Sequence, residues 1–352
     1  MIYIICSGWV KNLYTSTVVF DIIQFFSSLN HQFLPLILNK AGFDHKVSKF
    51  FSNYLVDRKT KYSWNNFSSP FYNINIGVGQ GSALSPILSI LYLSPIFHIL
   101  ENHLKNLKIP ISFLSFVDDG LFISQNKSIS VSNTNLFCSY NVISSLLTKF
   151  SLVMEHNKIN VFHFSRFHRA FNPSPLNLSP LGRLCLLLKT TWKYLGFIFN
   201  CKLSFQDHIN FYVNKAMLTV KCMKMLGNST RGLISLQKQC LYRCCTLPIT
   251  LYGFQLWYYN KAPLHYLLNI LKKMQHGAAI WIMGAFHTLP MDGIKAIARL
   301  IPIHLHLKKL YDRFLLKGFS LSSNHIIKLF ITHDNPQSLS YHRTLPTKLT
   351  SK

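Results

Sequence analysis

Acidic residues are scarce in this chain. Only 11 of its 352 residues are Asp or Glu, against 37 Lys or Arg, so the net charge is +26 and the pI is near 9.8. The positive excess is spread out, with 17 basic and 7 acidic residues in 1–200 and 20 and 4 in 201–352. A dispersed positive field over a large globular chain suits a polyanion, most often nucleic acid. A ribosomal type of protein and a membrane-surface protein remain alternatives.

Paired cysteine motifs are also lacking. None of the eight cysteines forms a Cys-x-x-Cys pair, so no disulfide framework is implied and a reducing compartment is favoured. Cys240, Cys244 and Cys245 fall at helical spacing, and we expect packed thiols there rather than zinc ligands. The apolar N-terminus has no basic region and no small-residue cleavage site, which argues against a secretory signal.

One long segment carries no charged residue. Ala83–Leu100 contains no Asp, Glu, Lys or Arg and is the best candidate for a membrane span. Pro86, Pro95 and the serines nearby favour a buried core helix instead. We therefore expect no stable membrane association, with a span near 83–100 kept as the alternative.

The periodicity of apolar residues predicts alternating strands and helices. A strand-like Thr17–Phe20 leads into Asp21, and a helical pattern runs from Phe25 to Leu38. Further along, the patterns predict a turn-rich stretch at 57–80 with a basic knot at Arg58, Lys59 and Lys61, a helix opened by Ser85-Pro86, a hairpin at 111–124, a helix near 134–150, a strand near 159–165, a loop at 171–180, a hairpin at 184–200 and helices from 206. No internal repeat is present.

The predicted hairpin at 111–124 places two carboxylates together. Phe116-Val117-Asp118-Asp119 follows an apolar run and precedes Gly120, which indicates two short buried strands with the acids at their turn. Charged groups are rarely placed in apolar surroundings without a partner. The pair suggests a site for a hard divalent cation, with an ordinary turn as the alternative.

A third carboxylate strengthens this interpretation. Asp21 ends a β-branched strand, where a residue can meet the hairpin across a sheet. Three Asp side chains at neighbouring strand ends can hold two Mg²⁺ ions about 3.5–4 Å apart for in-line phosphoryl transfer.

These residues resemble a known family. Phe20–Phe26, Gly79–Pro86 and Phe116–Asp119 are similar, in order and spacing, to motifs A, B and C of reverse transcriptases. Trp192–Phe197 looks like that family's primer-gripping hairpin, with Tyr194, Leu195 and Gly196 as the primer grip. Further matches, at Leu251-Tyr252-Gly253 with Trp257 and at Gln275–Phe286, resemble the non-LTR (LINE-like) retrotransposon branch of fungal type.

The resemblance implies a role for each matching residue. Asp21 and Asp118 would ligate both Mg²⁺ ions, for which Mn²⁺ could substitute, and Asp119 would be a weaker or indirect ligand. Phe26 would lie under the incoming sugar and select deoxynucleotides by clashing with a 2′-OH. Its alternative is a core ring of the helix at 25–38.

Motif B and a downstream lysine complete the implied site. Gln80, Gly81 and Ser82 would lie against the template and the nascent base pair, or would form only a tight helix entry. Lys158 would stand near the pyrophosphate leaving group and supply charge or a proton, or would be an ordinary surface lysine. The implied partners are an RNA template, a DNA primer and dNTPs.

The resemblance also implies an α+β fold. The palm is a ferredoxin-like antiparallel sheet with helices, followed by a mainly helical thumb or connector. The expected division is a fingers or entry-strand remnant at 1–20, the palm at 21–205, the thumb and connector at 206–332 and a polar tail at 333–352. A nuclear or cytoplasmic location follows from the family.

Several expected parts are missing from the chain. Only 20 residues precede Asp21, so we expect a fragment truncated at the N-terminus whose fingers region upstream sequence would supply. Ser27 and Asn200 stand where relatives often have proline and aspartate. The alternative to an RNA-directed DNA polymerase is therefore a degenerate, inactive fragment that only binds nucleic acid.

Overall fold

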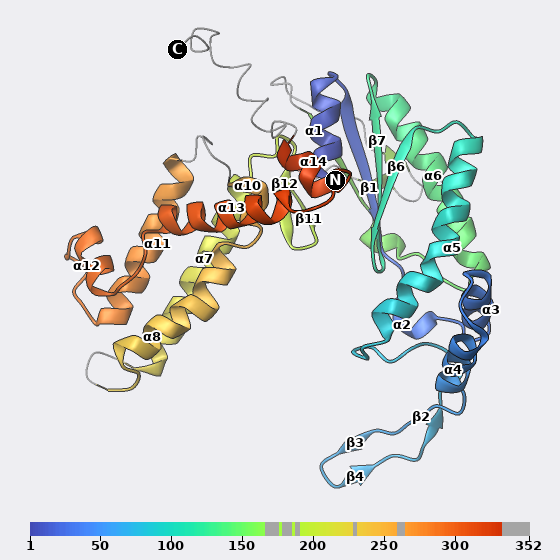
Figure 1. The fold of residues 1–352 in the computed structure, drawn as a ribbon, viewed down its shortest axis with the longest axis horizontal. Coiled ribbons are helices and arrows are strands. Elements are labelled where there is room, and N and C mark those ends of the chain that lie inside the picture. The colour runs from blue at the N-terminus through green and yellow to red at the C-terminus, as the bar shows by residue number, and fades with distance from the viewer. Residues whose placement is uncertain (166–175, 178–184, 187–190, 228–230, 259–264, 333–352) are drawn as a thin grey trace. The chain divides into compact units, whose positions relative to one another are not determined.

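The computed structural model describes residues 1–165, 176–177, 185–186, 191–227, 231–258 and 265–332 (Figure 1). The chain forms two compact units, Met1–Lys189 and Thr190–Lys352. The boundary between the two units lies before the hairpin near 191–200. The sequence analysis expected the boundary after that hairpin, at residue 205. Most of the expected loop at 171–180 and the polar tail after 333 lie outside the described residues.

The first unit contains a helical N-terminus, a small sheet and the helices that cover it. In chain order its elements are α1 (Ile2–Val10), β1 (Tyr14–Phe20), α2 (Phe25–Ser28), α3 (Phe33–Lys40), α4 (His45–Leu55), β2 (Lys59–Thr60), β3 (Ser63–Trp64), β4 (Phe67–Ser68), β5 (Tyr72–Asn73), α5 (Ser85–Asn106), β6 (Ile111–Phe116), β7 (Asp119–Asn126), α6 (Ile129–Lys149), the 3₁₀ turn η1 (His156–Lys158), β8 (Asn160–Phe164), β9 (Leu176–Asn177) and β10 (Cys185–Leu186).

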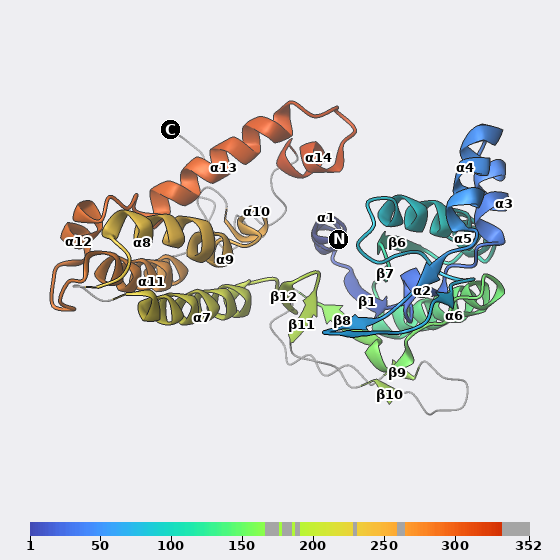
Figure 2. The same ribbon diagram turned by 90° about the horizontal axis from the view of Figure 1, so that it is seen from below.

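Four strands form an antiparallel sheet in the order β6-β7-β1-β8. With α5 before β6 and α6 before β8, this is the ferredoxin-like arrangement, so the predicted α+β palm is confirmed (Figures 1 and 2). β1 is buried from Thr15 to Phe20. Residues 1–20, which the sequence assigned to a fingers or entry-strand remnant, form α1 and the inner strand β1 of this sheet.

The predicted helix from Phe25 to Leu38 is wrong in its middle. It is divided into α2 and α3, and residues far along the chain bind the backbone of α2 and of Leu29 just after it. Gly77 donates its N–H to the carbonyl of Leu29 at 2.8 Å, and Val78 donates to the carbonyl of Phe26 at 2.7 Å. A local pattern of apolar residues carries no information about hydrogen bonds to Gly77 and Val78, which are far along the chain. The periodicity therefore predicted one continuous helix where the structure has two.

The charge-free segment folds as α5. Within the described residues α5 is the one helix long and apolar enough to cross a membrane, and such a helix is equally typical of a soluble core. One of its faces joins the palm core through Leu88, Tyr92, Leu93 and Ile96. Packing against the sheet and α6 therefore accounts for this face of the helix, while Ile87 and Ile90 on the same helix are exposed.

The second unit begins with a hairpin and continues as helices. Its elements are β11 (Thr191–Tyr194), β12 (Phe197–Asn200), α7 (Gln206–Met223), η2 (Lys224–Leu226), α8 (Ser235–Leu241), the π-helical turn η3 (Tyr242–Thr246), α9 (Leu247–Thr250), α10 (Phe254–Trp257), α11 (His265–Met283), α12 (Met291–Ile297), α13 (Ile303–Phe319) and α14 (Ile326–Thr332). The expected mainly helical region is confirmed. The expectation of packed thiols is wrong for Cys240 and Cys244, which are exposed with their Sγ atoms 4.0 Å apart.

A buried histidine makes the palm sensitive to acid. His163 on β8 lies inside the unit with Nδ1 2.7 Å from the Ser16 hydroxyl, and burial lowers its pKa to about 4. Because the unfolded chain takes up this proton near pH 6.5 and the folded chain does not, stability falls as the pH drops from 6.5 towards 4. We expect about 2 kcal/mol less free energy of unfolding at pH 5 than at pH 7 from this group alone.

The measurement is urea unfolding at the two pH values for the parent and for His163→Gln. The variant should lose about 2 kcal/mol of the parent's pH dependence, since glutamine does not titrate. An identical pH dependence in both proteins would show that His163 has the same pKa in the folded and the unfolded chain.

Candidate active site

The sheet brings Asp21 to the hairpin that carries the other two carboxylates. β1 pairs with β7 so that Phe20 faces Gly120, and Asp21 follows Phe20 while Asp119 precedes Gly120. Continuing this antiparallel register sets Asp21 opposite Asp119. The sequence predicted this meeting of strand ends, and the pairing of β1 with β7 produces it.

The turn between β6 and β7 presents Asp118. Phe116 pairs with Asp119, so Val117 and Asp118 form a two-residue loop. Val117 has φ of +54°, a left-handed conformation that is unfavourable for a β-branched side chain. Strained backbone of this kind is concentrated at functional sites, where the surrounding fold holds it in place. Sequence reasoning missed Val117, although valine in place of the usual glycine at a two-residue hairpin turn is a detectable signal.

Gly120 is required by the ring of Phe20. A Cβ at Gly120 would overlap the Phe20 ring, which packs there against Phe122 at a centroid distance of 5.5 Å. The missing side chain lets the strand bearing Asp21 lie close to the strand bearing Asp119. The glycine after the two acids thus has a steric explanation.

Lys158 reaches this site and bonds one of its carboxylates. Its Nζ lies 2.8 Å from Oδ2 of Asp21, and this hydrogen bond raises the pKa of the lysine. The backbone sets up the contact, since Glu155 donates its N–H to the carbonyl of Asp21 and Ile23 donates to Val153. The ammonium group is mostly exposed, so it can leave Asp21 without breaking any packing.

The carboxylates are close enough to affect one another. Burial, followed by the negative charges of Asp118 and Asp21, raises the pKa of Asp119 to about 6, while Lys158 opposes the rise. A cation shared by these acids would relieve the part of this shift that comes from like-charge repulsion. Burial and its two acidic neighbours therefore both hinder the ionisation of Asp119.

The donor chemistry of the three acids suits magnesium. Carboxylate oxygens are the ligands that Mg²⁺ takes in proteins. Across the described part of the chain, however, no three His, Cys, Asp or Glu side chains are already arranged as a metal site. The three acids thus fit the ion in the kind of donor atom, and in this structure Asp21 is paired with the ammonium of Lys158 instead.

Residues 77–85 form a glycine-rich entry to α5. Gly77 has φ of +83°, and a Cβ there would lie 2.6 Å from the carbonyl oxygen of Ser27, so only glycine allows this approach to α2. Ser85 donates its hydroxyl to the carbonyl of Gly79 at 2.7 Å. The loop is thereby held against the segment that follows Asp21.

Within this loop the predicted template residues are accessible. Gln80 and Gly81 are exposed, and Ser82 is half-buried with its hydroxyl 3.3 Å from that of Tyr54. Gly81 has φ of +93° and open space where a Cβ would lie. The geometry leaves the glutamine amide and this backbone free to meet a ligand.

Phe26 and its neighbour Phe25 have different surroundings. Phe25 is fully buried, whereas Phe26 is half-buried and packs on Phe25 with ring centroids 5.5 Å apart. The deep core position in α2 therefore belongs to Phe25. Phe26 keeps part of its ring accessible on the segment after Asp21.

The predicted primer-grip residues form the tip of the β11–β12 hairpin in the second unit. Leu195 and Gly196 are the two turn residues, with φ of +47° and +80°. Their carbonyls accept hydrogen bonds from the Tyr252 and Tyr212 hydroxyls at 2.9 and 2.7 Å. Tyr194 is buried beside Trp192, with rings 5.1 Å apart. Sequence reasoning missed Tyr212 as an anchor of this turn.

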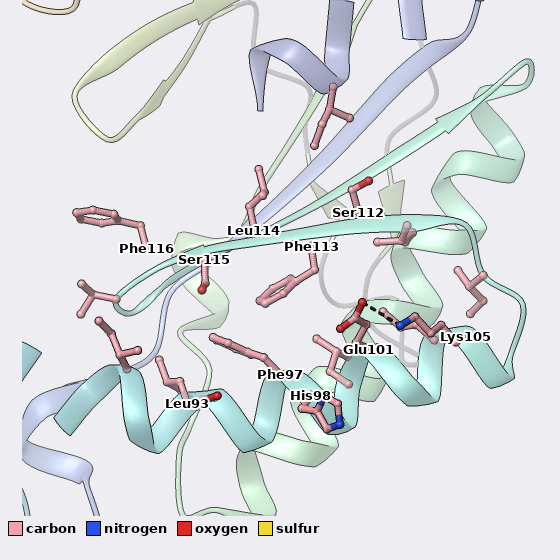
Figure 3. A pocket seen from close by; sticks show the side chains of 18 residues that line it. Leu93, Phe97, His98, Glu101, Lys105, Ser112, Phe113, Leu114, Ser115 and Phe116 are labelled. Carbon is pink, nitrogen blue, oxygen red and sulfur yellow. Dashed lines mark ion pairs between the residues drawn. The ribbon is translucent and has the colours of Figure 1, made fainter. Parts of the chain in front are cut away.

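An open cavity of about 940 Å³ lies between α5 and β6 and ends at Val117. Figure 3 shows Phe113 and Ser115 directed from β6 towards Phe97 on α5, with the Glu101–Lys105 ion pair of 3.1 Å at one end. The lining is mostly apolar and includes none of the three site aspartates. The cavity lies beneath the strand that leads into the Asp118 turn.

Comparison with known families decides the lineage. The model of the reverse transcriptase (RNA-dependent DNA polymerase) family matches residues 7–199, more than half of the chain. The chain belongs to the reverse transcriptase family. The matched range contains the three aspartates, Lys158 and all of the β11–β12 hairpin except Asn200. No curated protein matches this reverse transcriptase.

Solved structures with similarity to this reverse transcriptase include yeast telomerases. Apo telomerase from Candida tropicalis is 13% identical with a TM-score of 0.46, covering 99% of this chain and 54% of that one. Telomerase from the same species with a TWJ fragment of telomeric RNA is 12% identical with a TM-score of 0.44, covering 98% and 52%. The reverse transcriptase chain thus spans about half the length of these proteins.

Proposed function

We propose that this chain is an RNA-directed DNA polymerase of a non-LTR retrotransposon of fungal type, transferring nucleotides from dNTPs to a primer 3′-OH on an RNA template. The observation that carries this proposal is the meeting of Asp21, Asp118 and Asp119 at adjoining strand ends within the family's matched range. The retrotransposon branch rests on the motifs of the sequence.

Each residue of the site has a proposed part. Asp21 and Asp118 would hold two Mg²⁺ ions, with Asp119 as a weaker or indirect ligand, and the ions would lower the pKa of the attacking hydroxyl and neutralise charge on the phosphoryl oxygens. Gln80, Gly81 and Ser82 would orient the template and the nascent pair. Tyr194, Leu195 and Gly196 would hold the primer.

Lys158 would change partners during the cycle. In the structure its ammonium neutralises Asp21. Once a cation takes over Asp21, the exposed lysine would be free to approach the pyrophosphate leaving group and supply charge or a proton there. The ion pair would thus keep the Asp21 side chain ordered until the ion arrives.

The experiment that tests this function is primer extension on an RNA template by the purified chain, with Mg²⁺ or with chelator. Magnesium-dependent incorporation of dNTPs supports the proposal. Tight binding of the primer–template without any extension at saturating dNTP would favour the inactive, nucleic-acid-binding fragment instead.

The half-buried ring of Phe26 leads to a test of sugar selection. Phe26→Ala should admit ribonucleotides while largely retaining dNTP use, because it removes a clash with the 2′-OH and leaves the carboxylates in place. The measurement is the ratio of kcat/KM for dGTP over GTP in single-nucleotide extension.

Phe26→Tyr is the matched variant, since it keeps a ring at this position and should preserve discrimination. Unchanged discrimination in the alanine variant would mean that Phe26 serves only to pack against Phe25.

A further inference from the structure

A slender hairpin arm extends from the palm between α4 and the glycine-rich loop. It comprises Arg58–Asn75, in which β2 pairs with β5 near the base and β3 pairs with β4 at the tip. Figure 1 shows the tip projecting beyond the helices of its own unit. The sequence had marked this stretch as turn-rich, with a basic knot at Arg58, Lys59 and Lys61.

One face of the arm tip is aromatic. Trp64 lies directly opposite Phe67, and Tyr62, two residues before Trp64, shares their face. The other face carries Ser63 and Ser68, whose hydroxyls are 3.3 Å apart. A hairpin with this alternation normally buries its apolar face against a core.

Here the aromatic face is open to solvent. The exposed fractions are 68% for Tyr62, 79% for Trp64 and 67% for Phe67, and nearer the base Phe71 is 66% exposed. Rigid aromatic rings held out on a two-stranded arm form an exposed patch that indicates a binding partner.

The charge of the arm identifies the chemistry of that partner. Arg58, Lys59 and Lys61 are its only charged residues, and no Asp or Glu occurs from Arg58 to Leu100. Lys61 stands over the Phe71 ring at 5.5 Å from its centroid, and Arg58 over the Tyr54 ring at 5.3 Å. Interleaved cations and exposed rings suit single-stranded nucleic acid, which offers phosphates and unpaired bases together.

The base of the arm adjoins the predicted template residues. Ile74 donates its N–H to the carbonyl of Arg58 at 2.7 Å, and Ile76 bridges to Asn30 beside α2. The Arg58 guanidinium lies so near Gly79 that a Cβ there would be 3.3 Å from Nη2. A strand lying along the arm would therefore lead directly to Gln80 and Gly81.

We propose that the aromatic face of Tyr62, Trp64 and Phe67 is a stacking platform for single-stranded nucleic acid, with Lys59 and Lys61 beside it on the same strand of the arm. Its identification with the incoming template rests on the proposed polymerase function, whereas strand binding itself does not. Bases stack on the rings while the cations contact the phosphates, so the platform accepts any sequence.

Trp64 supplies a direct readout. The other four tryptophans (Trp9, Trp192, Trp257 and Trp281) are all at least 92% buried, so neutral quenchers and stacking bases act mainly on Trp64. The experiment titrates the full chain with a fluorescein-labelled oligouridine 12-mer in chelator, following tryptophan fluorescence and oligonucleotide anisotropy. Saturating oligonucleotide should quench Trp64 and protect it from acrylamide.

Two variants of Trp64 separate stacking from folding. Trp64→Ala should weaken oligonucleotide binding about tenfold and abolish the quenching, while Trp64→Phe should stay within about threefold of the parent. Phe286→Ala, which removes another highly exposed ring outside the arm, is the control and should leave affinity unchanged.

Three outcomes would overturn the platform: equal affinity of the parent and Trp64→Ala, no quenching of Trp64 at saturation, or a Trp64 that is already shielded in the free chain and becomes accessible on dilution. The last outcome would assign the arm to contacts between copies of the chain. Because the assay contains chelator and no dNTP, a failure of primer extension would leave its result standing.

Discussion

Asp118→Asn is expected to reduce magnesium-dependent primer extension by about a thousandfold or more. Asp118 lies at the tip of the β6–β7 turn, next to Val117 with its left-handed backbone. In the proposed function Asp118 is a ligand of both metal ions. Replacing one charged ligand by an amide should remove several kcal/mol of transition-state stabilisation while leaving the volume of the side chain unchanged.

Glu101→Gln is the matched control, because it also removes one carboxylate from the first unit. Glu101 is an exposed partner of Lys105 on α5, and surface pairs of this kind contribute little to stability. The control should extend primers within twofold of the parent. Extension by Asp118→Asn within tenfold of the parent would contradict the two-metal assignment.

Binding to a primer–template is expected to weaken about a thousandfold between 50 and 200 mM salt. The chain has a net charge of +26 spread over both units, and a groove that neutralises about six phosphates gives a log–log slope near −5. The measurement is fluorescence anisotropy of a labelled primer–template over this range.

Two primer–templates of unrelated sequence serve as the control. Contacts to the phosphate backbone carry no sequence information. The affinities of the two primer–templates should therefore differ by less than about threefold at every salt concentration. A flat salt response would falsify the nucleic-acid interpretation for the active polymerase and the inactive fragment alike.

Some features of the site could be read from the order of residue types. Asp21 follows a β-branched run, and Asp118-Asp119 stands between two apolar runs, so both strand ends were predictable from these short continuous apolar runs. Ser85-Pro86 likewise marked the start of α5. These signals are local, because a strand, a turn or a helix start depends mostly on the residues within a few positions.

Other features depended on partners distant in sequence. The break between α2 and α3 is accompanied by hydrogen bonds from Gly77 and Val78 to the backbone of Leu29 and Phe26. Lys158 contacts Asp21 because the backbone of 153–155 pairs with that of 21–23. The exposed cysteines are a similar case, since helical spacing is the same on a buried and on an open face.

By itself the sequence determined the chemistry available to this protein: three carboxylates in the order of a polymerase palm, a glycine-rich loop between them and a positive charge throughout. Only the tertiary structure decided which groups meet and which stay open. The register of β1 against β7 set Asp21 opposite Asp119, and the projection of the arm left Trp64 and Phe67 in solvent. The physical reason is that residue type fixes what a side chain can bind, whereas long-range pairing and packing fix its neighbours and its exposure.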